Sequence, residues 1–152
     1  MKIFVGADHR GFALKKDVID FFRAQGHTLV DMGTHEEGIS CDYPKIALEV
    51  AEQVVQTINS RGILICMTGI GHTIAANKVP GAYAALCYNK EAAVLSRQHN
   101  NSNILVLGSK FVGQDSITEI IDVWLKTEFE AGRHLRRVEQ IKSIEKKFLK
   151  EQ

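Results

Sequence analysis

The segment from Ile63 to Lys78 (ILICMTGIGHTIAANK) joins a cysteine to a glycine-rich turn. An apolar run ends at Cys66, glycines stand at 69 and 71, and helical character is predicted over Thr73–Lys78. Such a turn can present main-chain N–H groups to an anion. A thiol beside it becomes a base or nucleophile if a helix N-terminus or a cation lowers its pKa. The alternatives are a simple strand–helix turn and an inert buried cysteine.

Two pairs of neighbouring polar residues could also take part in chemistry. Asp8 and His9 follow the first apolar run. A carboxylate beside an imidazole can move protons at a hydroxyl group or bind phosphate. His99 and Asn100 end a polar helical segment. The alternatives are a cap on the following helix for Asp8 and a favourably placed helix C-terminus for His99.

Arg133 and Arg137 stand four residues apart and would share one helix face. Together they could hold a phosphate by forked hydrogen bonds, although solvated surface arginines are the simpler alternative. The chain has 19 Lys and Arg against 18 Asp and Glu, a net charge of +1. This balance predicts no nucleic-acid or membrane partner, but it leaves room for a local phosphate pocket.

Elements that could position these residues alternate along the chain. Short apolar runs typical of buried strands lie at Lys2–Gly6, Thr28–Met32, Gly62–Met67, Ala82–Cys87 and Asn103–Gly108. Segments with helical periodicity separate them, which predicts right-handed crossovers. We therefore expect a three-layer, doubly wound (Rossmann-like) α/β sandwich with a five-stranded, mostly parallel sheet plus a C-terminal helix. Ligands of such folds bind beyond the carboxyl ends of the strands, where the polar residues collect.

The last segment is predicted to be a helix over about 132–148 with a thin apolar stripe. Val138, Ile141, Ile144 and Phe148 form that stripe among many charged residues. It is either a largely solvated helix or one that packs on a partner subunit. The 152 residues otherwise predict a single domain, residues 1–152, because no linker or repeat interrupts the pattern.

Cysteine usage and hydropathy predict a cytoplasmic protein. Cys41, Cys66 and Cys87 are odd in number and lack C-x-x-C or zinc-type spacing, so reduced thiols and no metal are expected. The apolar run near Met1 is too short for a signal peptide. Apolar runs also fall short of the roughly 20 residues that a membrane span requires.

Taken together, the motifs resemble the B type of ribose-5-phosphate isomerase, whose superfamily includes the galactose-6-phosphate isomerase subunits. The resemblance covers the chain from Lys2 to about Lys147. It rests on Gly6-Ala7-Asp8-His9-Arg10-Gly11-Phe12, Asp42-Tyr43-Pro44, Cys66-Met67-Thr68-Gly69-Ile70-Gly71, Ile74-Ala75-Ala76-Asn77-Lys78, Ser96-Arg97-Gln98-His99-Asn100, and Gly132-Arg133-His134 with Arg137.

The resemblance implies an aldose–ketose isomerase of the pentose phosphate pathway that needs no cofactor or metal. It would interconvert ribose 5-phosphate and ribulose 5-phosphate through a cis-enediolate. Cys66 would be the base, with Thr68 assisting it or binding a substrate oxygen. Asp8, His99 and Tyr43 would serve ring opening and hydroxyl binding.

The remaining implied residues bind the substrate. Main-chain N–H groups of Met67, Thr68, Gly69, Ile70 and Gly71 would stabilise the enediolate, and His9, Arg133 and Arg137 would hold the phosphate. Asn100 would bond the sugar end. The family forms homodimers or dimer pairs with shared active sites, so the His99–Asn100 segment and Lys110 would reach in from a second subunit.

Three positions depart from the family pattern. Met67 replaces a common glycine, His72 replaces a common small residue, and Lys110 replaces a frequent arginine. Two bulky side chains near the sugar keep galactose 6-phosphate or another hexose 6-phosphate open as a substrate. A non-catalytic phosphosugar-binding module is a further alternative, against which the presence of both Cys66 and His99 argues. A thiol-redox protein is a third, weakened by the missing C-x-x-C motif.

Overall fold

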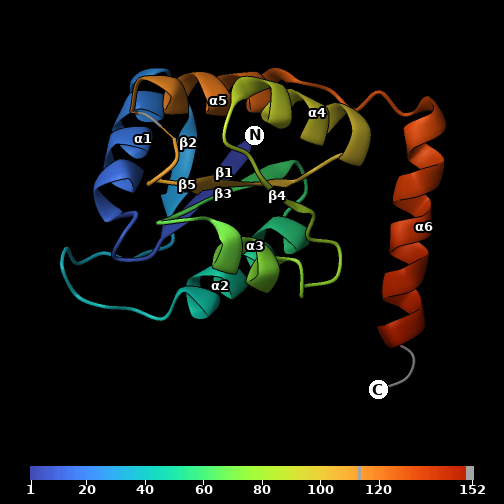
Figure 1. Ribbon diagram of the computed structural model, residues 1–152, viewed down its shortest axis with the longest axis horizontal. Coiled ribbons are helices and arrows are strands. Elements are labelled where there is room, and N and C mark those ends of the chain that lie inside the picture. Colours follow the sequence, from blue (N-terminus) through green and yellow to red (C-terminus); the bar gives the residue numbers. More distant parts are fainter. Residues whose placement is uncertain (113, 150–152) are drawn as a thin grey trace.

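The computed structural model describes residues 1–112 and 114–149, within which five parallel strands form one sheet flanked by six helices (Figure 1). The strands are β1 (Lys2–Ala7), β2 (Thr28–Asp31), β3 (Ser60–Cys66), β4 (Ala84–Leu86) and β5 (Ile104–Gly108), in the spatial order β2-β1-β3-β5-β4. The helices are α1 (Phe12–Ala24), α2 (Tyr43–Gln56), α3 (Ile70–Ala76), α4 (Lys90–Asn100), α5 (Gln114–Lys126) and α6 (Gly132–Leu149). The predicted α/β sandwich with a C-terminal helix is confirmed.

Successive residues of the central strands enter two different cores. Ile63 and Ile65 point to the face covered by α1, α4 and α5, where Trp124 is fully buried. Leu64 points to the opposite face, where it packs with Val50 of α2. Because helices cover both faces, successive residues in the middle of these strands are apolar, such as Ile63, Leu64 and Ile65. This is the physical reason that the strands are recognisable as continuous apolar runs.

A ligand crevice is expected where β1 and β3 lie side by side. The two helices that follow these strands, α1 and α3, pack on opposite faces of the sheet (Figure 1). Ala7 pairs with Ile65, and the Asp8 N–H donates to the Ile65 carbonyl oxygen at 3.3 Å. The carboxyl ends of the two strands therefore meet at the topological switch point, where the strand order reverses. This is the usual ligand-binding position in doubly wound sheets.

Two elements differ in extent from the sequence expectation. Helix α3 begins at Ile70, not Thr73, because the N–H and hydroxyl of Thr73 both donate to the Gly69 carbonyl oxygen, at 3.0 and 2.9 Å. Strand β4 is shorter than predicted. The Tyr83 N–H leaves the strand ladder and donates to the Asn103 side chain at 2.7 Å.

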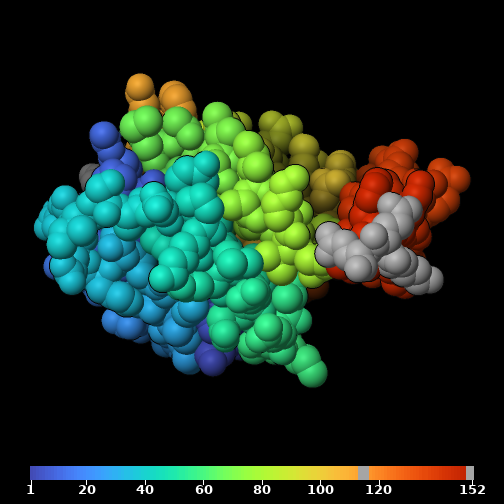
Figure 2. Space-filling view, turned by 90° about the horizontal axis from the view of Figure 1, so that it is seen from below, coloured from blue at the N-terminus to red at the C-terminus, as the bar shows by residue number. Residues whose placement is uncertain are grey.

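Helix α6 lies apart from the layered body, at the end of the molecule next to segment 78–85 (Figures 1 and 2). Within its described residues only His134 and Val138 are buried. Ile144 and Phe148 remain 58% and 60% exposed, so the apolar stripe is largely uncovered by the chain's own body. Among the described residues, no helix has both the length and the apolar character needed to cross a bilayer.

Candidate active site

Cys66 ends β3 and is buried beneath the glycine-rich turn, with only 6% of its surface exposed. The Gly69 N–H donates to its Sγ at 3.0 Å. Burial raises the pKa of the Cys66 thiol, and the negative charge of Asp8 adds to this effect. Main-chain N–H groups of Gly69, Thr68 and His72 oppose it. In the single chain burial outweighs these hydrogen bonds, so the pKa is raised, whereas a reactive thiol would need a lowered pKa.

Glycine is required at two positions of the turn for different reasons. Gly69 has φ of +82°, in the left-handed region, and a Cβ there would collide with Leu86. Gly71 is not strained, but a Cβ on it would come within 2.6 Å of the Tyr43 ring. Gly69 allows the backbone to turn over the thiol, and Gly71 allows the Tyr43 ring to approach.

Asp8 and His9 follow β1, and the Asp8 charge acts on the Cys66 thiol. One carboxylate oxygen of Asp8, which is 7% exposed, accepts the N–H groups of Arg10 and Gly11 at 2.9 and 3.1 Å. Asp8 therefore also stabilises the turn before α1. This role is close to the helix cap that the sequence analysis gave as the alternative for Asp8. The Cys41 N–H donates to His9 Nδ1 at 3.4 Å. In neutral His9 this places the proton on Nε2, where it can be donated to a phosphate oxygen.

Tyr43 opens α2 and reaches the same crevice. Its ring packs edge-on against His72, with centroids 5.8 Å apart and planes at 78°. His72 is fully buried, and burial lowers its pKa to about 4 despite the opposing charge of Asp8. The His72 side chain, which departs from the family pattern, is therefore directed into the protein. The Met67 side chain, by contrast, is 39% exposed at the mouth of the turn.

The end of β5 closes the crevice from the other side. The Lys110 N–H donates to the Met67 carbonyl oxygen at 3.0 Å, so Lys110 lies beside the turn of its own chain. Sequence reasoning assigned no role to Tyr88, whose hydroxyl donates to the Thr68 carbonyl oxygen at 3.3 Å. The available signal was its place directly beyond β4, at the carboxyl edge of the sheet.

The other predicted residues form a second group around α4 and α6. The His99 and His134 rings stack with centroids 4.1 Å apart and planes at 9°. Burial and the nearby charges of His99, Arg133 and Arg137 lower the pKa of His134. Arg133 and Arg137 are exposed on the first turns of α6. This group concentrates positive charge and hydrogen-bond donors, as a phosphate site requires.

Arg97 fixes the second group in place. Its guanidinium, 2% exposed, donates to the Thr127 carbonyl oxygen at 3.2 Å and to Asn101 Oδ1 at 3.0 Å. It also donates to the Ser102 carbonyl oxygen. The Glu130 N–H bonds to the Gln98 carbonyl oxygen at 3.1 Å. The end of α4 and the segment leading into α6 are thus held together.

His99, Glu130 and His134 are, among the described residues, the group whose ligand atoms approach within 4.8 Å of one another. Metal binding would require the ring nitrogens to point their in-plane lone pairs at one ion about 2.1 Å away. Parallel stacked rings direct those lone pairs side by side, and Arg133 adds a repelling charge. The arrangement does not suit a metal.

The two groups lie at opposite edges of the sheet. Cys66 and Asp8 are at the carboxyl edge, whereas α4 carries the chain back to the amino edge and ends at His99 and Asn100 just before β5. The 11 residues of α4 span about 16 Å. One chain therefore does not bring Cys66 and Asp8 together with His99 and the arginines of α6.

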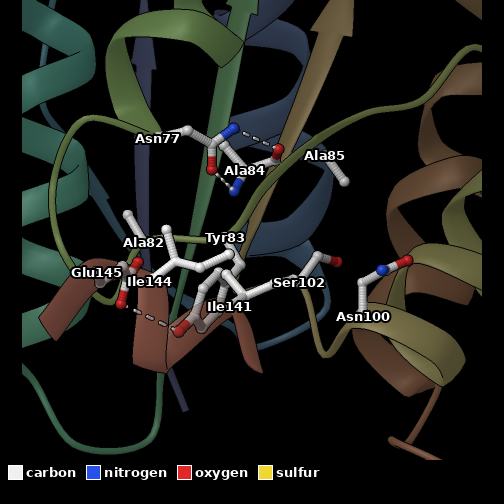
Figure 3. Close-up of a pocket in the computed structure, with 10 residues that line it drawn as sticks. All are labelled: Asn77, Ala82, Tyr83, Ala84, Ala85, Asn100, Ser102, Ile141, Ile144 and Glu145. Carbon is white, nitrogen blue, oxygen red and sulfur yellow. Dashed lines mark hydrogen bonds between the residues drawn. The ribbon is translucent and has the colours of Figure 1, made fainter. Parts of the chain in front are cut away.

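A groove separates α6 from the edge of the sheet (Figure 3). It has a volume of about 420 Å³, and its walls include Asn100, Ile141 and Ile144. Glu145 bridges it, accepting from the Gly81 N–H at 3.2 Å and the Tyr83 hydroxyl at 3.4 Å. These bonds tie the far end of α6 to its own chain.

The fold and site define a doubly wound α/β protein with a buried thiol and a carboxylate at the switch point of its sheet. The family model described as Ribose/Galactose Isomerase matches residues 3–141. The chain belongs to this family.

Relatives match over nearly the whole chain. A ribose-5-phosphate isomerase B of Escherichia coli (strain K12) is 43% identical over 146 residues, 96% of this chain and 97% of that protein. The solved structure of the Clostridium thermocellum ribose-5-phosphate isomerase B is 51% identical, with a TM-score of 0.94 over 97% of this chain and 99% of that one. The Mycoplasma genitalium enzyme, solved with bound ribulose 5-phosphate, is 41% identical, with a TM-score of 0.91 over 95% and 96% of the two chains.

Proposed function

We propose that this protein is a ribose-5-phosphate isomerase that interconverts ribose 5-phosphate and ribulose 5-phosphate in the pentose phosphate pathway. The observation that carries the proposal is the buried thiol and carboxylate at the switch point, in a chain 41% identical to an enzyme solved with ribulose 5-phosphate. The direct test is conversion of ribose 5-phosphate to ketose by the purified protein, without added metal.

Cys66 is the proposed base. Its thiolate removes the proton from C2 of the open aldose, giving a cis-enediolate, and the proton returns to C1 to form the ketose. The raised pKa of the resting thiol means that ionisation needs help from the assembled site. The guanidinium groups of Arg133 and Arg137, approaching from a second chain, supply positive charge that stabilises a thiolate.

Other groups prepare and hold the substrate. Asp8, Tyr43 and His99 serve ring opening and hydroxyl binding, and Thr68 assists at a substrate oxygen. The main-chain N–H groups of residues 67–71 stabilise the enediolate, although those of Gly69 and Ile70 already bond Cys66 Sγ and Thr68 Oγ1 at rest. Because the Gly69 bond favours the thiolate, transfer of these donors to the substrate would accompany movement of the C2 proton to the sulfur.

We further propose a homodimer, alone or paired into a tetramer, in which each site combines the Cys66 group of one chain with the α4–α6 group of another. Asn100 then bonds the sugar end, while His9, Lys110 and the α6 arginines surround the phosphate. The separation of the two groups in one chain and the uncovered stripe on α6 support this arrangement.

Mixed dimers test the shared site. In a purified heterodimer with Cys66→Ala in one chain and Arg137→Ala in the other, one site is intact and one carries both defects. We expect about half the activity of the wild-type dimer, because the two sites of a twofold dimer are equivalent. A heterodimer whose remaining activity shows the raised KM of Arg137→Ala would show instead that both residues serve the site of their own chain.

Galactose 6-phosphate is the second candidate substrate. The family description includes galactose isomerases, and the exposed Met67 side chain alters the sugar end of the site. The ratio of kcat/KM for five- and six-carbon aldose phosphates decides between them, and we expect it to favour ribose 5-phosphate.

We also infer that residues 1–152 act as one domain and that the protein works in the cytoplasm. Cys41, Cys66 and Cys87 are unpaired thiols, which fits a reducing compartment.

A further inference from the structure

His72 is a buried polar side chain to which the proposed mechanism assigns no role. It stands in the first turn of α3, directly behind the turn that covers Cys66, and its exposure is 0%. Within the described part of the chain, neither Nδ1 nor Nε2 has a hydrogen-bond partner. Leaving such groups unpaired costs stability, so an apolar side chain would be favoured here if packing were the only requirement.

The surroundings of His72 connect it to the ring-opening groups. Its ring meets the Tyr43 ring edge-on at 5.8 Å, and Tyr43 in turn lies against Gly71. The Asp8 carboxylate is the charge that acts on the imidazole. Burial keeps the ring neutral at physiological pH, with one nitrogen as donor and one as acceptor. His72 thus lies next to Tyr43 and within the electrostatic reach of Asp8, two of the three side chains proposed to handle the sugar hydroxyls.

We propose that His72 is a positioning residue: its imidazole pairs with Asp8 when the sugar binds, and its ring holds Tyr43 against Gly71. The proposal rests on the function proposed above for Asp8 and Tyr43. In the resting protein neither ring nitrogen has a hydrogen-bond partner among the residues that the structure describes, and one of them gains Asp8 as a partner when the sugar is bound. The side chain therefore lowers the stability of the resting protein but serves the reaction. Unpaired buried groups of this kind require such an explanation.

Three variants separate positioning from packing. His72→Leu removes both nitrogens and retains apolar volume, whereas His72→Gln keeps one donor and one acceptor. His27→Leu is the matched control, because His27 also packs edge-on against an aromatic ring, Phe22, at 5.7 Å. His27 precedes β2 at the amino edge of the sheet, away from the crevice.

We expect His72→Leu to melt at a higher temperature than the wild type, yet to turn over ribose 5-phosphate about tenfold more slowly, a change of about 1.4 kcal/mol in the barrier. The loss should fall mainly on kcat. His72→Gln should recover most of the rate, and His27→Leu should match the wild-type kinetics. Loss of a purely structural contact would lower stability and rate together.

Proton exchange sharpens the test. Ribulose 5-phosphate cannot close to a five-membered ring, because its O5 carries the phosphate, so exchange of its C1 proton with solvent bypasses ring opening. We expect His72→Leu to keep this exchange close to the wild-type rate.

Wild-type kcat and KM in His72→Leu would overturn the proposal, and so would a melting temperature below the wild-type value. A leucine variant that fails to fold gives the second of these results. An inactive wild-type protein would instead refute the proposed isomerase function, independently of His72.

Discussion

The two groups of site residues, one around Cys66 and one around His99 and Arg137, are held in place in different ways. Cys66 ends a strand that is buried on both faces, and the surrounding turn accepts hydrogen bonds from two other segments, residues 109–110 and Tyr88. Arg137 is exposed on a helix that contributes only two buried side chains to its own body. The difference suggests that the first group is preorganised by the sheet. The second is positioned by α4, by Glu145 and, in our proposal, by a second chain.

The largest effect should follow loss of the thiol. Cys66→Ala removes the proposed base, so we expect kcat to fall by about 10³-fold or more, as general-base catalysis accounts for 10²–10⁴-fold. Exchange of the C2 proton of ribose 5-phosphate, followed by NMR in heavy water, should disappear while the fold remains. Cys87→Ala, which removes a buried thiol outside the site, is the control. Wild-type exchange in Cys66→Ala would remove Cys66 as the base.

Backbone substitutions compare the rigidity of the two regions directly. Gly69→Ala combines a left-handed φ of +82° with a collision at Leu86, and should cost about 2–4 kcal/mol of unfolding free energy. Gly132→Ala, at φ of +48°, has no described atom within 4 Å of the new Cβ and should cost about 1 kcal/mol. Denaturant unfolding measures both. Equal costs would show that the turn over Cys66 is not the tighter structure.

On the α6 side, the effect should appear in substrate binding. Arg137→Ala removes a charge-assisted bond to phosphate of about 1.5–3 kcal/mol, so KM should rise by roughly 10- to 100-fold. Arg136→Ala is the matched control, because Arg136 is the adjacent exposed arginine and lies about 100° around the helix. If both variants bind ribose 5-phosphate equally well, Arg137 is a surface charge.

The smallest expected effect is the influence of the Asp8 charge on the pKa of Cys66. The Asp8 charge raises the pKa of Cys66, so Asp8→Asn should lower that pKa and shift the thiolate population to lower pH. The rate of thiol alkylation, measured against pH in a Cys41→Ala, Cys87→Ala background, should reach its half-maximum at a lower pH in the Asn variant. An upward shift would mean that loss of the Asp8 turn buries the sulfur further.

Most of the fold was predictable because its signals are local. Strand-length apolar runs mark β1, β3 and β5, since these strands are covered on both sides. Pro44 near the start of α2 and the polar boundary at Asn89 mark helix ends in the same way. The start of β4 and the start of α3 were misplaced. Their bounds depend on bonds made by the Asn103 side chain and by Thr73.

The sequence predicted which residues form the site, but it did not predict how their side chains are buried and oriented. Asp8, Tyr43 and Cys66 follow from the rule that ligands bind beyond the carboxyl ends of parallel strands, together with the family motifs. The raised pKa of the thiol and the inward direction of His72 could not be foreseen, because each depends on burial among residues distant in sequence.

The sequence by itself determined the alternation of strands and helices, the family, and the residue types available for isomerisation. Periodicity and motif order depend only on the order of residues along the chain, so they can be recognised before the fold is known. Only the tertiary structure decided that Cys66 and His99 lie at opposite edges of one sheet. That separation arises because a parallel crossover must return the chain to the amino edge before the next strand begins.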